Sequence, residues 1–523
     1  MEKLQRACGK IIAGLGILAF GYLAFYAWTS SARIHASSEI VVWSEDGIWK
    51  NLLFTAGVLV SCAGIGALAD RVSNKALRAA AVVISLAVAL GCGILAGAAH
   101  SYPSADQIYV YEAAVNFFSG DYTNIQTEWY FNACPYQLGL GLLYGILMRI
   151  SGGNSYFVLY DAQAVCAGVT IYASFEMTLE LFRSKKAAAV TLVCSILFLP
   201  MYLYTFYIYG ETFGVCFSML GMLFWLRANN GKPGKRAVTV LYWVLSGLCL
   251  ALCYTARLAL IIVLIAMVVT GLLYALTGRQ QEGRWRWSCP ALTVLLLLFT
   301  LGSQKLSVAY MEHQAGVDLA EGMPAVLTVA MGIQDENENE NGTGPGSYNA
   351  YNLWLYFESG FDGERATSEA LLNIKQTLYR WSRDPAYMIS YLNQKVLNQW
   401  NEATYGCFFM TALQQEPEEW VTDLYTGTAG DKWYAFLNLY QGMVYVMLLF
   451  YFVILLKEKD HIFYFLPALL LLGGFCFSMI WEAKSRYVYP YIVMSLPCVA
   501  WSLVYCAGKI TGGIKKWRKK PLS

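Results

Sequence analysis

Long apolar runs, many of them about twenty residues long, recur along the whole chain and are separated by polar segments. A helix needs about 20 apolar residues to cross the hydrocarbon core of a bilayer, and lipid cannot satisfy the backbone polar groups of an open structure. The pattern therefore predicts an all-α polytopic membrane protein with about twelve transmembrane helices. The runs begin near Ile11, Asn51, Ala79, Ser155, Ala187, Glu211, Ala237, Arg257, Cys289, Phe436, Ile462 and Tyr489.

Composition agrees with this pattern. Of the 523 residues, 57% are hydrophobic and 14% are charged, whereas soluble domains carry about 25% charged residues. The net charge of +2 argues against a nucleic-acid partner. The lipid bilayer is the expected surrounding of the chain.

The basic residues predict which ends of the spans face the cytoplasm, because Lys and Arg concentrate in cytoplasmic loops. The stretch from His100 to Met148 contains neither and is expected outside. We expect a multi-pass protein of the cell membrane with both termini in the cytoplasm. The cations that mark the cytoplasmic side are Lys3, Arg6, Lys10, Arg71, Lys75, Arg78, Arg183, Lys185, Lys186, Arg227, Lys232, Lys235, Arg236, Arg279, Arg284, Arg286, Lys457, Lys459 and those from Lys509 to Lys520.

One apolar run conflicts with simple alternation of the loops. The stretch Tyr136–Ile150 has a helical pattern but is short. Counting it as a span would place the basic loop Arg183–Lys186 outside. We therefore predict a helix that lies in or dips into the outer interface of the membrane.

Three parts of the chain follow from this topology. Residues 1–308 form a transmembrane module whose first outer loop (100–154) carries interfacial helices. Residues 309–436 form a mainly α extracytoplasmic domain, and residues 437–523 form the last spans and a basic cytoplasmic tail. The extracytoplasmic domain is acidic, with about eighteen Asp and Glu against about six Lys and Arg.

Two local patterns stand out within that domain. Its helical pattern from Ser368 to Tyr391 is broken at Asp384-Pro385. The run Asp335–Asn341 alternates acids with Asn and lacks apolar periodicity, which predicts a solvated loop. A calcium site in this run is the less favoured alternative, since the EF-hand spacing is absent.

Several classes of chemistry are disfavoured by missing motifs. No P-loop, dinucleotide-binding, zinc-protease or serine-hydrolase motif is present, which argues against ATP-driven work and against those hydrolases. The 14 cysteines show no metal-like spacing. Cys134 and Cys407 both fall in predicted outer segments, and the sequence does not decide whether they pair.

Two acids lie where apolar sequence meets the outer face. Asp106 follows the third span, and Glu211 begins a later one. Asp106 serves equally well as a helix N-cap, and Glu211 suits the first turn of a helix through the helix dipole. Both acids on one face of the membrane could instead share a site, with one acting as a base.

Three cations share that boundary. Arg257 stands alone between two apolar runs, either as a snorkelling side chain or as a phosphate ligand. Lys484 and Arg486 lie in a tight turn that is expected on the outer side, whereas most Lys and Arg residues fall in the predicted cytoplasmic loops. Their anionic partner is either Glu482, in a structural ion pair, or a lipid phosphate.

These segments resemble the GT-C glycosyltransferases, and bacterial relatives of the dolichyl-phosphate-mannose protein mannosyltransferases (glycosyltransferase family 39) in particular. Ser104–Gln107, Phe118–Tyr122 and Pro135–Gly139 resemble the first outer loop of that family. The short helix Tyr136–Ile150 is similar to its juxtamembrane helix, and Trp481–Tyr487 is similar to a turn in Gram-positive members. Where many relatives carry Asp as the second acid, this chain has Glu211.

The resemblance implies a polyprenyl-phosphate sugar as donor and an extracytoplasmic acceptor in the cell envelope, which is a glycan, a lipid or a protein. Transfer would invert the anomeric carbon, with Asp106 as general base and Glu211 as its catalytic partner. A divalent metal (Mg or Mn) held by Asp106 and Glu211 is an open alternative. The expected ligands of the donor phosphate are Arg257, Lys484 and Arg486, and the expected substrate-binding residues are Gln107, Tyr209, Glu482 and Tyr487.

Other functions compete with this interpretation. A polysaccharide polymerase or ligase would use similar lipid-linked donors at the same face. A flippase for lipid-linked glycans would place charges near the bilayer midplane and repeat its halves. A receptor or scaffold would account for the acidic domain but not for the paired boundary acids.

Overall fold

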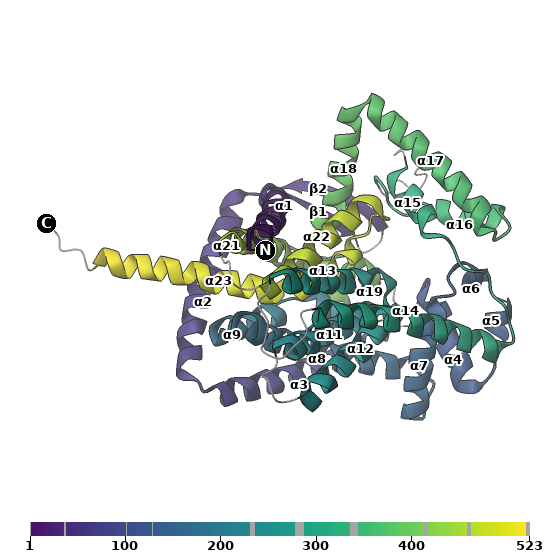
Figure 1. Ribbon diagram of the computed structural model, residues 1–523, viewed down its shortest axis with the longest axis horizontal. Helices are drawn as coiled ribbons and strands as arrows, with labels where there is room; N and C mark the ends of the chain where they lie inside the picture. Colours follow the sequence, from purple (N-terminus) through teal and green to yellow (C-terminus); the bar gives the residue numbers. More distant parts are fainter. Residues whose placement is uncertain are drawn as a thin grey trace.

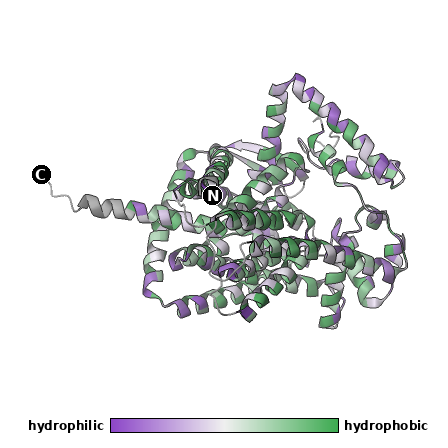
Figure 2. Cartoon of the chain, in the orientation of Figure 1, coloured by the Kyte–Doolittle hydropathy of each residue, from purple (hydrophilic) through white to green (hydrophobic). Residues whose placement is uncertain are grey.

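A computed structural model describes residues 2–35, 38–100, 102–127, 129–230, 236–277, 287–334, 344–412, 417–457 and 462–518. These residues are mostly helical and form a bundle with a helical projection at one side (Figure 1). Apolar residues extend along the bundle helices (Figure 2). The expected polytopic helical architecture is confirmed.

Ten helices of the described chain are long and apolar enough to cross a membrane, or eleven if one bent pair forms a single span. The predicted count of about twelve is therefore not confirmed in the described part of the chain. The ten comprise α1 (Glu2–Thr29), α2 (Ile48–Arg71), α3 (Asn74–Ala99), α8 (Tyr156–Phe182), α12 (Arg236–Ala256), α13 (Ile261–Thr277, preceded by η2, Leu258–Leu260), α14 (Ser288–Ala315), α21 (Gly427–Leu455), α22 (Phe465–Ile480) and α23 (Tyr489–Arg518).

Two predicted spans account for the difference. The bent pair consists of α9 (Lys185–Ile196) and the segment Pro200–Phe206, at an angle of 59°. The second, α11 (Glu211–Asn230), is not among the ten. Most of α11 is buried, and it packs against α8 and α12. Polar residues at both of its ends reduce its apolar length.

The first outer loop contains four helices, and the last confirms the predicted short helix. This helix, α7, has 15 residues and ends at Gly152, whose φ is +73°. This helix packs closely against α4. A β-carbon at Gly141 or Gly145 of α7 would collide with α4, so these two glycines permit the close approach. Its placement at the membrane interface stays a prediction. The four are α4 (Gln107–Ser119), α5 (Thr123–Thr127), α6 (Trp129–Ala133) and α7 (Gln137–Ser151).

An antiparallel hairpin, which the sequence did not predict, follows α1 in this mostly helical chain. Its strands are β1 (Ser30–His35) and β2 (Ser38–Glu45). The β-branched and aromatic residues of β2 suit a strand, but no element was predicted for this segment from the sequence. Arg33 ties the hairpin to Asp431 at the start of α21 through an ion pair of 2.7 Å.

A late helical segment projects beyond the bundle (Figure 1). Asp384 lies between two of its helices and accepts a hydrogen bond from Tyr387 N (3.0 Å), which confirms the predicted break. Both α14 and α21 run through the predicted domain boundaries. The acidic run Asp335–Asn341 lies outside the described residues. The segment consists of α15 (Ala325–Ile333), α16 (Tyr351–Glu358), α17 (Gly363–Arg383) and α18 (Pro385–Trp400), followed by α19 (Cys407–Ala412) and α20 (Glu419–Asp423).

Two predicted cytoplasmic loops meet at one end of the bundle. Lys186 forms an ion pair of 2.7 Å with Asp70, and Lys185 donates to Val72 O at 3.2 Å. The loops after α2 and α8 therefore lie at the same end, as the topology with a non-spanning α7 requires. All 14 cysteines are free, so Cys134 and Cys407 do not form a disulfide.

Candidate functional site

The loop before α4 leaves the Asp106 carboxylate exposed and free. Asp106 directly precedes α4, but its side chain makes no capping hydrogen bond. No hydrogen bond or ion pair joins its carboxylate to any described residue. Ala105 adopts a left-handed conformation with φ +50°, which costs a non-glycine residue roughly 1–2 kcal/mol. Asp106 therefore occupies the N-cap position of α4, as one interpretation predicted, but its side chain does not form the capping hydrogen bond.

Gln107 connects this loop to the turn before α11. Its side chain is buried, and its Oε1 accepts a hydrogen bond from Ile208 N at 2.7 Å. Its Nε2 donates to Ser104 O at 3.2 Å. A second link joins the hydroxyls of Tyr130 and Tyr209 at 2.7 Å. These bonds hold the first outer loop against the turn that carries Glu211.

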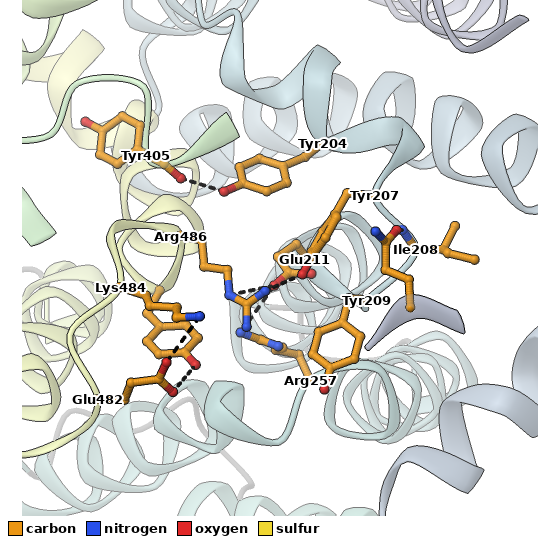
Figure 3. A network of polar contacts seen from close by, with 12 residues as sticks. Tyr204, Tyr207, Ile208, Tyr209, Glu211, Arg257, Tyr405, Glu482, Lys484 and Arg486 are labelled. Carbon is orange, nitrogen blue, oxygen red and sulfur yellow. Dashed lines mark hydrogen bonds and ion pairs between the residues drawn. The ribbon is translucent and has the colours of Figure 1, made fainter. Parts of the chain in front are cut away.

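Glu211 is fully buried at the first turn of α11 and lies beside Arg257 (Figure 3). The Arg257 Nη2 atom is 3.2 Å from Glu211 Oε1. Gly210 makes this approach possible: its φ is +96°, and a β-carbon there would lie 1.9 Å from Ala256 O. Arg257 lies at the break between α12 and η2. Its guanidinium group pairs with Glu211 there and does not snorkel.

Arg486 approaches the same acid from the turn between α22 and α23. Its Nε atom lies 4.0 Å from Glu211 Oε1, and its Nη1 donates to the Tyr207 hydroxyl. The Nε atom is buried and donates no hydrogen bond to a described residue. Two guanidinium groups from distant parts of the chain therefore converge on one carboxylate (Figure 3).

Three tyrosine rings surround the two guanidinium groups. The Arg486 carbon Cζ lies 5.7 Å, 5.5 Å and 5.4 Å from the ring centres of Tyr207, Tyr209 and Tyr487. Arg257 lies 5.1 Å from Tyr487 and 5.8 Å from Tyr209. Such cation–π contacts stabilise a desolvated cation by up to about 2 kcal/mol. The rings also hold both cations in fixed orientations.

Lys484 lies between two carboxylates. Its Nζ atom is 3.4 Å from Glu482 Oε1 and 3.4 Å from Glu39 Oε1 of β2. Glu482 also accepts a hydrogen bond of 2.9 Å from the Tyr487 hydroxyl. The structural ion pair expected between Lys484 and Glu482 is confirmed, and Glu39 is an additional partner.

The negative charges of Asp106 and Glu211 both favour the protonated form of the Tyr207 hydroxyl. Burial raises the pKa of Tyr207, the Arg486 charge lowers it, and Glu211 and then Asp106 raise it further. Burial also raises the pKa of Tyr209, with contributions from Tyr130 and Asp106. Both carboxylates therefore contribute to the electrostatic environment of Tyr207, and the shared site of Asp106 and Glu211 stays a prediction.

The residues present do not suit a divalent metal. Glu211 faces Arg257 and Arg486, whose positive charges oppose a second cation. No group of three or more metal-binding side chains was found in the described parts of the chain. We therefore derive no step through a metal held by Asp106 and Glu211.

Most of the predicted site residues come together at one end of the bundle, but several neighbours were missed. Tyr207 and Tyr130 gave no signal beyond the general abundance of tyrosine. Glu39 falls in the unexpected hairpin. The predicted residues that meet directly are Glu211, Arg257 and Arg486, with Tyr209 and Tyr487 as their ring contacts, and Lys484 and Glu482 as an adjoining pair. Gln107 bonds to the turn before α11, whereas its neighbour Asp106 has no such bond to a described residue.

A buried acid outside the predicted set supports this end of the bundle. Glu402 is fully buried and accepts hydrogen bonds from Thr404 N (3.1 Å), Thr404 Oγ1 (2.6 Å) and Gly406 N (2.7 Å). Burial raises its pKa. These bonds close the loop from Glu402 to Gly406. Within this loop, the carbonyl oxygen of Tyr405 accepts a hydrogen bond of 2.5 Å from the Tyr204 hydroxyl. Glu402 therefore fixes the backbone beneath the turn that carries Glu211.

A second ion-pair cluster lies at the opposite end of α11. The buried Glu176 lies 2.7 Å from Arg78 Nε and 2.5 Å from Arg227 Nη2. Two of the predicted sorting charges thus also have a structural role, joining α3, α8 and α11.

Comparison with known proteins agrees with the fold. A family model described as "Conserved hypothetical integral membrane protein" matches residues 6–505. No curated protein and no solved structure matches the chain significantly. The match covers nearly the whole chain, including the site at the end of the bundle and all but the end of the last candidate span. The chain belongs to this family of integral membrane proteins.

Proposed function

We propose that the protein is a membrane glycosyltransferase that moves a sugar from a polyprenyl-phosphate donor to a hydroxyl of an extracytoplasmic acceptor. The single observation that carries the proposal is the convergence of Arg257 and Arg486 on the buried Glu211, in a turn to which the loop of the exposed Asp106 is bonded through Gln107. A phosphate needs oriented cationic donors, and an attacking hydroxyl needs a base that is not already paired. Both groups are available at one end of the bundle.

In the proposed reaction, Asp106 removes the proton from the acceptor hydroxyl. The hydroxyl oxygen forms a new bond to the anomeric carbon, while the bond from that carbon to the phosphate oxygen breaks. The bonding electron pair leaves with the polyprenyl phosphate, which gains one negative charge. Attack opposite the leaving group inverts the anomeric configuration.

The two arginines would stabilise the charge that develops on the leaving phosphate. Such stabilisation is strongest from donors that are already oriented and shielded from water. Arg486 has an unused buried Nε, and tyrosine rings hold both guanidinium groups. Glu211 keeps the two cations together when no phosphate is bound. Lys484 contributes less, because Glu39 and Glu482 already balance its charge.

The location of the charges favours transfer over transport. A flippase is expected to place ionisable groups near the bilayer midplane. Here one cluster lies where α11 begins and another where α11 approaches its end. A polymerase or ligase would use the same donor phosphate chemistry, and it differs from the proposal only in its acceptor.

A donor screen tests the proposal. Purified protein in lipid nanodiscs is given labelled polyprenyl-phosphate sugars and an extract of cell-envelope glycans, with nucleotide sugars as a parallel set. We expect transfer from at least one lipid-phosphate donor and none from nucleotide sugars. Asp106→Asn should lower the rate by about 10²–10⁴-fold.

Asp121→Asn is the matched control, since Asp121 lies in the same predicted outer loop and its carboxylate accepts hydrogen bonds from Thr123 N (3.1 Å) and Thr123 Oγ1 (2.7 Å). It should retain transfer within about twofold. Full activity of Asp106→Asn would contradict the base assignment, and transfer from nucleotide sugars would contradict the donor class.

A further inference from the structure

The helix α18 begins in the helical projection and ends inside the bundle (Figure 1). Its last residue, Trp400, packs against Phe20 of α1, with the two ring centres 6.1 Å apart. The Trp400 indole also donates a hydrogen bond of 2.8 Å to the Ser478 hydroxyl, close to the end of α22. Two candidate spans therefore hold the C-terminal end of α18.

A second contact with α1 shows how α18 crosses this span. The Tyr22 hydroxyl donates a hydrogen bond of 2.8 Å to Asn393 Oδ1. Asn393 and Trp400 are about 10 Å apart along α18, whereas Tyr22 and Phe20 are only about 3 Å apart along α1. The helix α18 therefore crosses α1 at a steep angle and runs closer to the membrane plane than to the direction of the span.

The level of this crossing lies near one surface of the bilayer. Tyr22 lies about 10 Å from Thr29, the last residue of α1. The candidate span that contains both has 24 residues, which is several ångströms longer than the hydrocarbon core of roughly 30 Å. The apolar face of an interfacial helix reaches about 5–10 Å below the headgroup boundary, so α18 lies at the depth of such a helix.

One face of the N-terminal half of α18 continues from this contact toward the lipid. Ala386, Ile389 and Asn393 recur at the three- and four-residue spacing of a single helix face. Asn393 contacts α1, whereas Ala386 and Ile389 lie farther from the bundle and are exposed, Ile389 by 63%. The opposite face is covered, because the Tyr391 and Trp381 rings pack with their centres 5.4 Å apart. The α1-facing side of the helix is therefore apolar and uncovered beyond Asn393.

The corner before α18 is rich in cations. Lys375, Arg380 and Arg383 fall within ten residues, in a predicted domain that has about six Lys and Arg in total. The acid in this stretch, Asp384, caps α18 through its side chain. Arg383 is exposed beside the start of α18. Cations next to an exposed apolar helix face are typical of segments that bind phospholipid headgroups.

We propose that residues 385–392 of α18 lie in the bilayer leaflet at the Thr29 end of α1. Ile389 and Ala386 contact the acyl chains of phospholipids, and the cations of the corner lie at the level of the lipid phosphates. The helical projection is thereby anchored on the lipid surface and is not held away from it in water. This inference does not depend on the proposed glycosyl transfer.

Fluorescence quenching tests this placement on the full chain in phospholipid nanodiscs. A small fluorescent amino acid replaces Ile389 by stop-codon suppression, which leaves the native cysteines unlabelled. Lipids with a doxyl group near the carbonyl end of the acyl chain quench it from the bilayer, and iodide quenches it from water. The same label in place of Phe25, which is 62% exposed on α1, gives the value for lipid contact. The label in place of Glu369, exposed on α17, gives the value for water.

We expect doxyl quenching at Ile389 to reach at least about half of the Phe25 value and about threefold the Glu369 value, with weak iodide quenching. The label in place of Ala386 should give the same result, and it replaces the first measurement if the Ile389 variant does not elute as a single folded species. Doxyl quenching below half of the Phe25 value at both positions, or iodide quenching as strong as at Glu369, would overturn the inference.

Discussion

Glu211→Gln tests whether the acid holds the two arginines together. The substitution keeps the shape of the side chain and removes its charge. Glu211 is fully buried, and Arg257 and Arg486 are largely buried beside it. Without the carboxylate, two desolvated cations would face each other unbalanced.

The magnitude follows from the geometry. At an effective dielectric constant of about 20, unit charges at the observed 3.2 Å and 4.0 Å attract by about 5 and 4 kcal/mol. Desolvation of the three groups offsets much of this attraction. Removing one partner of a buried ion pair typically costs about 3–5 kcal/mol, and we expect Glu211→Gln to lower the free energy of unfolding by that amount.

Reversible denaturation in mixed micelles measures this change. The double variant Glu211→Gln/Arg257→Gln should recover part of the loss, with a coupling energy of at least about 1 kcal/mol. Glu369→Gln, an exposed position on α17, should stay within about 0.5 kcal/mol of wild type. Additive effects of the two single changes, or a stable Glu211→Gln, would refute the charge-balance argument.

Four further substitutions test other parts of the account. Arg486→Lys removes the planar donor group, so the KM for a lipid-phosphate donor should rise about tenfold in a transfer assay. Burial lowers the pKa of Lys395 in the folded protein from 10.5 to about 7. Between these two pH values the unfolded chain therefore binds more protons than the folded chain. Stability should therefore fall as the pH falls from about 10.5 to 7, by roughly 1 kcal/mol per unit, and denaturation of Lys395→Met should lack this slope. Ala105→Gly should raise the unfolding free energy by about 1 kcal/mol, because it relieves the positive φ. Gly210→Ala should lower it by more than about 2 kcal/mol, since its β-carbon would collide with Ala256 O.

The helical architecture was predictable because hydropathy and charge sorting are dictated by the bilayer. Most expected spans appear as helices, and the short run predicted at Tyr136–Ile150 is the helix Gln137–Ser151, which is shorter than the candidate spans. The count of about twelve spans is not confirmed, since α11 ends in polar residues and is not among the ten candidate helices, and α9 bends into the next segment. Length and hydropathy alone do not reveal such breaks.

The site was predictable only in part. Isolated charges next to apolar sequence pointed to Arg257 and Glu211, since such charges are costly unless they are paired. Their partners depended on long-range folding: Glu39 lies on a hairpin that was not expected, and Tyr207 meets Arg486 across most of the chain. Nothing local in the sequence marks the buried pairing of Glu176 with Arg78 and Arg227.

The most direct test of the account is the position of the donor phosphate. Electron cryomicroscopy of the protein in nanodiscs with a non-transferable polyprenyl-phosphate sugar would locate it. The account predicts phosphate oxygens within about 3 Å of the guanidinium nitrogens of both Arg257 and Arg486, with the sugar beside Asp106. A phosphate bound instead at the Arg78–Glu176–Arg227 cluster, or a sugar facing away from Asp106, would contradict it.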